Sequence, residues 1–158
     1  MKITKGYRKN VGLVILNKEG DVLLCKRKNT SYWQFPQGGI DKKELPLDAA
    51  YRELYEEVNI SKDEISLIAE AQNWINYDVP AEHKKFSLAL KNFKGQTQKW
   101  FLFMLKKKVH ISFNNDTIQE FDDYKWVSYW YPLNKIIWFK RDVYKQVLRE
   151  FAKFYSRI

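Results

Sequence analysis

The sequence contains a single cysteine, Cys25, among its 158 residues. A lone cysteine excludes a disulfide within the chain and any metal site built from several thiolates. Long hydrophobic runs are missing as well: the longest apolar stretch covers residues 11–16, whereas a membrane-spanning helix needs about 20 residues. The charged N-terminus is not followed by the apolar segment of a secretory signal. We therefore expect a cytoplasmic protein that does not associate with a membrane.

Glycine and proline are scarce too, with six and four residues respectively. The sequence has no linker rich in these residues, no internal repeat and no low-complexity tract. Its 45% hydrophobic and 30% charged residues are typical of a globular protein. Because this length suits one domain, we expect a single domain over residues 1–158.

Positive charge is in excess, since 28 lysines and arginines stand against 19 acidic residues, a net charge of +9. Such an excess favours phosphate-rich partners, above all nucleic acid. The same excess also arises from AT-rich coding sequence, which enriches lysine together with asparagine, isoleucine, phenylalanine and tyrosine. Charge alone does not decide between these two explanations.

Two segments have the periodicity of amphipathic helices, because apolar residues recur at helical spacing over residues 46–58 and 140–156. Pro46 suits the first turn of the first helix, and Asn59 stands where a left-handed residue would end it. Strands are predicted at residues 8–16, 21–27, 65–71, 85–90, 97–106 and 124–130, the first two forming a hairpin. Residues 33–40 are expected to form a loop or a short strand. The elements mix without regular βαβ alternation, which predicts an α+β fold with a mixed-sheet sandwich.

The first predicted helix carries three glutamates, Glu53, Glu56 and Glu57, at positions i, i+3 and i+4. On a helix these side chains share one face, where three like charges repel one another. A divalent cation with oxygen ligands would offset that repulsion. The alternative is a solvated acidic face, which is common on surface helices.

The residues around these glutamates resemble the Nudix box, the signature of hydrolases that cleave nucleoside diphosphates linked to another group. The box covers residues 38–60, and its matching positions are Gly38, Glu44, Arg52, Glu53, Glu56 and Glu57. At typical residue frequencies, a chance match at all of them is on the order of one in ten million. Asn59 departs from the usual glycine, but asparagine also tolerates the left-handed conformation. The resemblance implies an α/β/α sandwich with a mixed β-sheet.

The resemblance also implies a metal-dependent reaction at this helix. Glu53, Glu56 and Glu57 would hold a divalent cation, most simply Mg²⁺, with Mn²⁺ or Zn²⁺ as alternatives. The family pattern adds Glu120 and Gly38 to the candidate metal site. Arg52 would orient a glutamate through a charge-assisted hydrogen bond, while Gly39 and Glu44 would have structural roles. The general base stays open among Glu56, Glu57 and Glu120.

Segments outside the box resemble the branch of Nudix hydrolases that acts on the 5′ end of RNA. These segments cover residues 33–40, 98–101, 120–122, 126–132 and 139–144. The resemblance implies removal of pyrophosphate from 5′-triphosphorylated RNA, which promotes mRNA decay. We expect no DNA substrate, and the sequence does not identify a protein partner. One alternative is hydrolysis of dinucleoside polyphosphates such as diadenosine tetraphosphate, because those enzymes share the stretch at 33–39. Another is a catalytically silent RNA-binding module, against which the complete glutamate set argues.

Four residues are candidates for contacts with the RNA, namely Arg8, Arg27, Phe139 and Lys140. A triphosphate needs cations besides the metal, and Arg27 and Phe139 offer planar surfaces on which a base could stack. The alternatives are a solvated strand face for the two arginines and core packing for Phe139. We expect His83 to be a surface residue without a partnered spacing.

Overall fold

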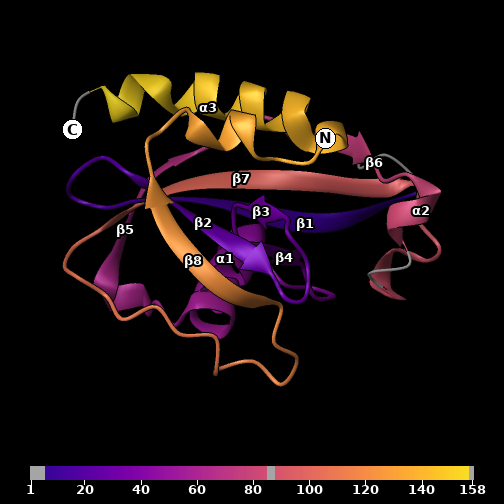
Figure 1. The fold of residues 1–158 in the computed structure, drawn as a ribbon, viewed down its shortest axis with the longest axis horizontal. Coiled ribbons are helices and arrows are strands. Elements are labelled where there is room, and N and C mark those ends of the chain that lie inside the picture. Colours follow the sequence, from indigo (N-terminus) through magenta and orange to yellow (C-terminus); the bar gives the residue numbers. More distant parts are fainter. Residues whose placement is uncertain (1–5, 85–87, 157–158) are drawn as a thin grey trace.

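The computed structural model describes residues 6–84 and 88–156, which build a mixed β-sheet between two helices (Figure 1). The strands are β1 (Tyr7–Leu16), β2 (Val22–Arg27), β3 (Trp33–Gln34), β4 (Gln37–Gly39), β5 (Ile65–Glu70), β6 (Ile75–Asp78), β7 (Gly95–Leu105) and β8 (Phe121–Val127). The α-helices are α1 (Pro46–Val58), α2 (Ala81–Lys84) and α3 (Arg141–Tyr155). Short 3-10 helices are η1 (Lys62–Glu64), η2 (Leu88–Leu90), η3 (Tyr131–Asn134) and η4 (Trp138–Lys140).

Strands β1 and β7 run parallel at the centre of the sheet, and the other strand pairs are antiparallel. Because side chains alternate along a strand, both central strands bury apolar residues on both faces. On β1, Val14 and Leu16 pack with α3, whereas Leu13 and Ile15 pack with α1. Figure 1 shows α3 lying along one side of the sheet and α1 on the other. The predicted α/β/α sandwich with a mixed sheet is confirmed.

Helix α1 has the predicted bounds, Pro46–Val58, and the predicted ends. Pro46 opens the first turn, and Leu45 makes no side-chain capping bond. Asn59 adopts the left-handed conformation with φ 63° and ψ 37°, and its backbone N–H donates to carbonyls of the last turn. Asparagine therefore ends the helix where the Nudix pattern usually has glycine.

The predicted hairpin of β1 and β2 is present, but its two strands are paired at Leu16 and Val22 and then separate. Beyond that point β1 pairs with β4 and β7, whereas β2 pairs with β3 and β8. No helix among the described residues has the length and apolar character needed to cross a membrane.

Two strand predictions were wrong in part. Residues 88–90 form the 3-10 helix η2 rather than a strand, and residues 85–87 of that prediction lie outside the described residues. Strand β8 ends at Val127 because the chain then turns into η3, so residues 128–130 are not extended. The sequence analysis also missed β6, a four-residue strand paired with the start of β7.

Candidate active site

A cleft of about 450 Å³ opens beside α1 and collects residues from distant parts of the chain. Its lining includes most of the candidate residues: Arg8, Arg27, Gly38, Gly39, Arg52, Glu53, Glu56, Glu57 and Glu120. The separation of β1 from β2 lets these segments meet, since Arg8 lies at the start of one strand and Arg27 at the end of the other. Three candidates lie elsewhere: Glu44 contacts Arg52 from the side, while Phe139 and Lys140 line an adjoining pocket.

The guanidinium of Arg52 connects the acidic residues on one side of this cleft. It donates two hydrogen bonds of 2.9 Å to the carboxylate of Glu44, through Nε and Nη2. Nη1 donates to Glu53 Oε1 at 2.9 Å and to Glu56 Oε2 at 3.1 Å, and Nη2 donates to the carbonyl of Gly39 at 2.8 Å. The hydrogen bond from Arg52 lowers the pKa of the Glu44 carboxyl. One cation thus fixes the rotamers of two cleft glutamates and joins α1 to β4.

The two glycines at the cleft are required by close approach of neighbouring side chains. A Cβ on Gly38 would lie 2.0 Å from Cδ of Glu53, and a Cβ on Gly39 would lie 2.0 Å from Nη2 of Arg8. Any side chain at these positions would displace a glutamate or an arginine from the cleft. The glycine pair therefore allows the carboxylate of Glu53 from α1 and the guanidinium of Arg8 from β1 to lie directly over β4.

Burial, reinforced by neighbouring negative charges, suppresses ionisation of Glu53, Glu57 and Glu120. Glu53 and Glu57 are only 6% and 4% exposed. Burial raises the pKa of Glu53 to about 7, against the opposing effect of Arg52. Burial, followed by the charges of Glu120 and Glu53, raises the pKa of Glu57 to about 10. Desolvation also raises the pKa of Glu120, while Arg27 opposes that shift.

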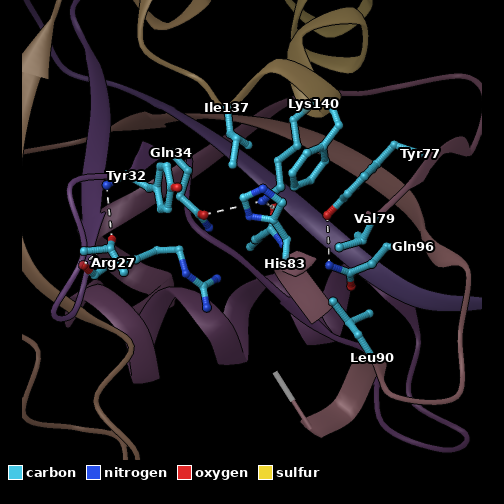
Figure 2. Close-up of a pocket in the computed structure, with 13 residues that line it drawn as sticks. Arg27, Tyr32, Gln34, Tyr77, Val79, His83, Leu90, Gln96, Ile137 and Lys140 are labelled. Atoms are coloured by element: carbon cyan, nitrogen blue, oxygen red, sulfur yellow. Dashed lines mark hydrogen bonds between the residues drawn. The ribbon is translucent and has the colours of Figure 1, made fainter. Parts of the chain in front are cut away.

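The adjoining pocket is narrower, with a volume of about 70 Å³, and more apolar (Figure 2). Arg27, Thr30, Gln37, Leu90 and Gln96 line both the pocket and the cleft, so the two adjoin each other. Figure 2 shows Arg27 reaching in from the side opposite Tyr77. The half-buried ring of Phe139 lies 5.1 Å from the ring of His83 and 6.2 Å from that of Tyr77, measured between centroids.

Lys140 lies at the base of this pocket with an exposed fraction of 7%. Its Nζ lies 3.4 Å from Oε1 of Gln34 and from Oε1 of Gln37, and 5.6 Å from the centre of the Tyr77 ring. Burial, with a contribution from the charge of Arg27, lowers the pKa of Lys140 to about 7. The pocket therefore ends in a positioned hydrogen-bond donor whose charge depends on pH.

A chain of buried amides holds Gln37 beneath the cleft. The indole Nε1 of Trp100, which can only donate, bonds to Oε1 of Gln98 at 3.1 Å. Nε2 of Gln98 then donates to Oδ1 of Asn10 at 2.8 Å and to Oε1 of Gln37 at 3.3 Å. Gln37 Oε1 also accepts a hydrogen bond from Lys140. Because the indole of Trp100 can only donate, it fixes which end of the Gln98 amide faces Gln37. The amide oxygen of Gln37 is in turn left facing the pocket.

Residues 6–151 match the sequence profile of the NUDIX domain, which covers most of the chain. The chain belongs to the Nudix family. It is a hydrolase of the kind that acts on phosphoric anhydride bonds, as its glutamate helix predicted.

Two groups of known proteins resemble this Nudix chain. A protein named RNA pyrophosphohydrolase from Vibrio atlanticus is 45% identical over 148 residues, covering 93% of this chain and 86% of that protein. One of the same name from Tolumonas auensis is 44% identical over 154 residues, covering 93% and 85%. Among solved structures, a Caenorhabditis elegans Ap4A hydrolase has a TM-score of 0.71 at 22% identity, covering 96% of this chain and 99% of that one. An Escherichia coli dihydroneopterin triphosphate pyrophosphohydrolase has a TM-score of 0.71 at 23% identity, covering 92% and 99%. At these identities the structural matches support the fold only.

Nudix hydrolases generally need divalent metal cations, and the donor set of the cleft fits such an ion. Glu53, Glu56, Glu57 and Glu120 provide oxygen ligands, which hard cations prefer. Burial raises the pKa values of Glu53, Glu57 and Glu120, and the charges of neighbouring acids add to each shift. Across residues 6–84 and 88–156, no three acidic, histidine or cysteine side chains already converge as a complete metal centre. Magnesium commonly keeps several water ligands and needs few protein oxygens, so this open arrangement is compatible with it.

The raised pKa values predict that the metal-free Nudix protein loses stability as the pH rises from about 5 to about 9. The pKa of Glu57 is about 10 in the folded protein, against roughly 4.3 in an unfolded chain. The stability linked to its protonation is complete below the unfolded pKa and is lost as the pH rises toward the folded value. Glu53, at about 7, acts in the same direction. Thermal unfolding in chelator should show a loss of several kcal/mol over this range, because each pH unit between the two pKa values is worth about 1.4 kcal/mol.

Glu57→Gln provides the variant for this prediction. A glutamine is neutral at every pH, so the variant should be more stable than the wild type at about pH 8 and depend less on pH. Asp48→Asn is the matched control, because Asp48 is exposed on the same helix and outside the cleft. An identical pH dependence in Glu57→Gln and the wild type would contradict the prediction.

Some residues of this Nudix site were missed by the sequence analysis. His83 was expected at the surface without a partner, but it is half-buried and packs against Phe139 in the pocket. Tyr77 and Gln96 also line the pocket, and they hydrogen-bond to each other at 2.9 Å. Tyr77 lies on β6, which was not predicted, so no signal in the sequence placed it here. The half-buried positions of Arg8 and Arg27 in the cleft do not fit the alternative of a solvated strand face.

Proposed function

We propose that this protein is an RNA pyrophosphohydrolase that removes pyrophosphate from the 5′ end of triphosphorylated RNA. The product would be 5′-monophosphorylated RNA in the cytoplasm, open to further decay. The observation that carries the proposal is an acidic cleft that lies next to an aromatic and basic pocket, with Arg27 lining both. A phosphate chain fits the first and a nucleobase fits the second. The relatives that carry this name support the same choice.

The acidic cleft is the proposed reaction centre. Glu53, Glu56 and Glu57, with Glu120 and Gly38, would hold the divalent cation, for which Mg²⁺ is the first choice and Mn²⁺ or Zn²⁺ the alternatives. When bound, the cation neutralises phosphate charge and favours attack by water on the anhydride. Arg52 keeps Glu53 and Glu56 in fixed rotamers, with Glu44 and Gly39 as its anchors. Glu56, Glu57 and Glu120 all line this cleft and are the candidates to accept a proton from the attacking water.

The cations around the cleft are the proposed binding site for the 5′ end. Arg8 and Arg27 would pair with phosphate oxygens, which guanidinium groups bind through two parallel hydrogen bonds. Phe139 offers its ring to a base in the pocket, and Lys140 donates to the edge of that base. The hydrogen-bonded chain that runs from the indole of Trp100 through Gln98 keeps Gln37 and Lys140 in position.

A direct competition tests the proposal. Triphosphorylated RNA and diadenosine tetraphosphate are supplied at equal concentration with Mg²⁺, and kcat/KM is measured for each. We expect the RNA to have the higher value, because only RNA places further nucleotides in the pocket. A higher kcat/KM for the dinucleotide would overturn the assignment to RNA.

Replacing Arg27 with alanine should raise the KM for triphosphorylated RNA with a smaller effect on kcat. The side chain lines both cavities, and loss of one phosphate contact should reduce the slope of log K against log salt by roughly one. Lys18→Ala is the matched control, since it removes one positive charge from the exposed turn between β1 and β2. Equal kinetics and equal salt slopes in the two variants would remove Arg27 from the binding site.

A further inference from the structure

Trp138 is the most solvent-exposed aromatic residue in the described part of the chain, with an exposed fraction of 69%. It begins the 3-10 helix η4 and lies directly before Phe139, whose ring centroid is 5.5 Å away at an interplanar angle of 88°. Indole is a large apolar group with a polar edge, and its exposure to water carries a free-energy cost. Packing among the described residues therefore does not account for this side chain.

Trp138 lines a groove of about 630 Å³ between β6 and the start of α3. Tyr77, Val79 and Phe139 line both this groove and the pocket that contains Lys140. Of the residues that the structure describes, none lines both the groove and the acidic cleft. The three hollows therefore follow one another in the order cleft, pocket, groove.

We propose that this groove binds the RNA chain downstream of its 5′ end, and that a nucleobase stacks on the indole of Trp138. The inference rests on the proposed function, because that function gives the substrate a direction. When the 5′ phosphates lie in the cleft and a base lies in the pocket, the following nucleotides leave past Phe139 and reach Trp138. Stacking on an aromatic ring accepts any base, as required of an enzyme that acts on many transcripts.

The charges around the groove indicate that stacking, rather than attraction of phosphates, provides this contact. Lys84 and Lys94 line the groove, but Asp78 and Asp142 line it as well. Asp78 also accepts a hydrogen bond from the hydroxyl of Tyr7. Because two positive and two negative side chains balance among the described lining residues, binding here should add little salt dependence. The aromatic surface of Trp138 is left as the principal source of affinity.

The length of the RNA provides the test. KM and kcat are measured for a triphosphorylated dinucleotide, which ends in the pocket, and for an unpaired triphosphorylated hexanucleotide, which reaches the groove. Trp138→Ala should raise the KM of the hexanucleotide roughly fivefold or more, with kcat unchanged. The same variant should change the KM of the dinucleotide by less than about twofold. The fold-change for the hexanucleotide should be the same at low and high salt.

Two further variants separate stacking from damage to the fold. Trp138→Phe should retain most of the hexanucleotide affinity, because phenylalanine keeps an aromatic face. Trp130→Ala removes another exposed tryptophan, 46% exposed and outside the groove, and should change neither substrate. If Trp138→Ala changes the KM of both RNA lengths equally, the inference is overturned. It is also overturned if the variant changes the KM of neither RNA, and the groove would then be left to a protein partner. Failure of the proposed function is seen separately, because the wild-type enzyme would then hydrolyse neither RNA.

Discussion

Replacing Glu56 with glutamine lowers kcat about a thousandfold and leaves the fold intact. The amide keeps the size and the oxygen of the carboxylate but removes its charge, so it binds a hard cation far more weakly. Loss of the charge stabilisation that a bound metal gives is worth several kcal/mol, which corresponds to this decrease in rate. Glu56 is preferred to its neighbours because its side chain is 34% exposed, so the substitution leaves packing nearly unchanged.

The measurement is release of pyrophosphate from triphosphorylated RNA under saturating substrate and Mg²⁺. Circular dichroism and thermal unfolding establish that the variant is folded, and RNA binding without turnover should stay close to that of the wild type. Asp48→Asn, on the exposed first turn of the same helix, should keep full activity. If Glu56→Gln retained more than about a tenth of wild-type activity, the assignment of a metal to this helix would be wrong.

The acidic helix could be predicted from the sequence because everything that defines it is local. Apolar spacing fixed residues 46–58 as a helix, Pro46 and Asn59 marked its ends, and the glutamates shared a face by their spacing alone. The Nudix pattern then predicted that Arg52 would contact a glutamate. The structure shows such contacts with Glu53 and Glu56, two of the three glutamates on that face.

The neighbouring pocket could not be predicted in the same way, because its walls come from segments far apart in the chain. His83 and Tyr77 meet Phe139 only after β6 pairs with β7 and η4 packs beside them. Lys140 was expected as a cation at the start of the last helix, whereas the structure buries it beneath two glutamines. Its lowered pKa follows from that burial, which periodicity does not reveal.

Substitution of Arg52 should damage both the activity and the stability of the protein, and lysine should not restore either. The guanidinium makes five hydrogen bonds in different directions, to Glu44, Glu53, Glu56 and the carbonyl of Gly39. An ammonium group keeps the charge but cannot span these acceptors. We expect Arg52→Lys to lower kcat by about a hundredfold or more, with Arg52→Gln lower still.

The loss of stability on removing Arg52 follows from the acids that it leaves behind. Arg52 lowers the pKa of the Glu44 carboxyl in the folded protein. This pair therefore stabilises the fold fully at pH values above the pKa of glutamate in the unfolded chain. The stabilisation is lost as the pH falls from that value through the lower pKa of the folded protein. Arg52→Gln should therefore cost about 2 kcal/mol near neutral pH, a decrease of roughly 4–8 °C in Tm, and less in acid. Arg149→Lys, an exposed change on α3, is the control for an arginine-to-lysine replacement in itself. If Arg52→Lys matched the wild type in both kcat and Tm, charge alone would suffice at this position, and the directional hydrogen bonds would have no part in holding the glutamates for reaction.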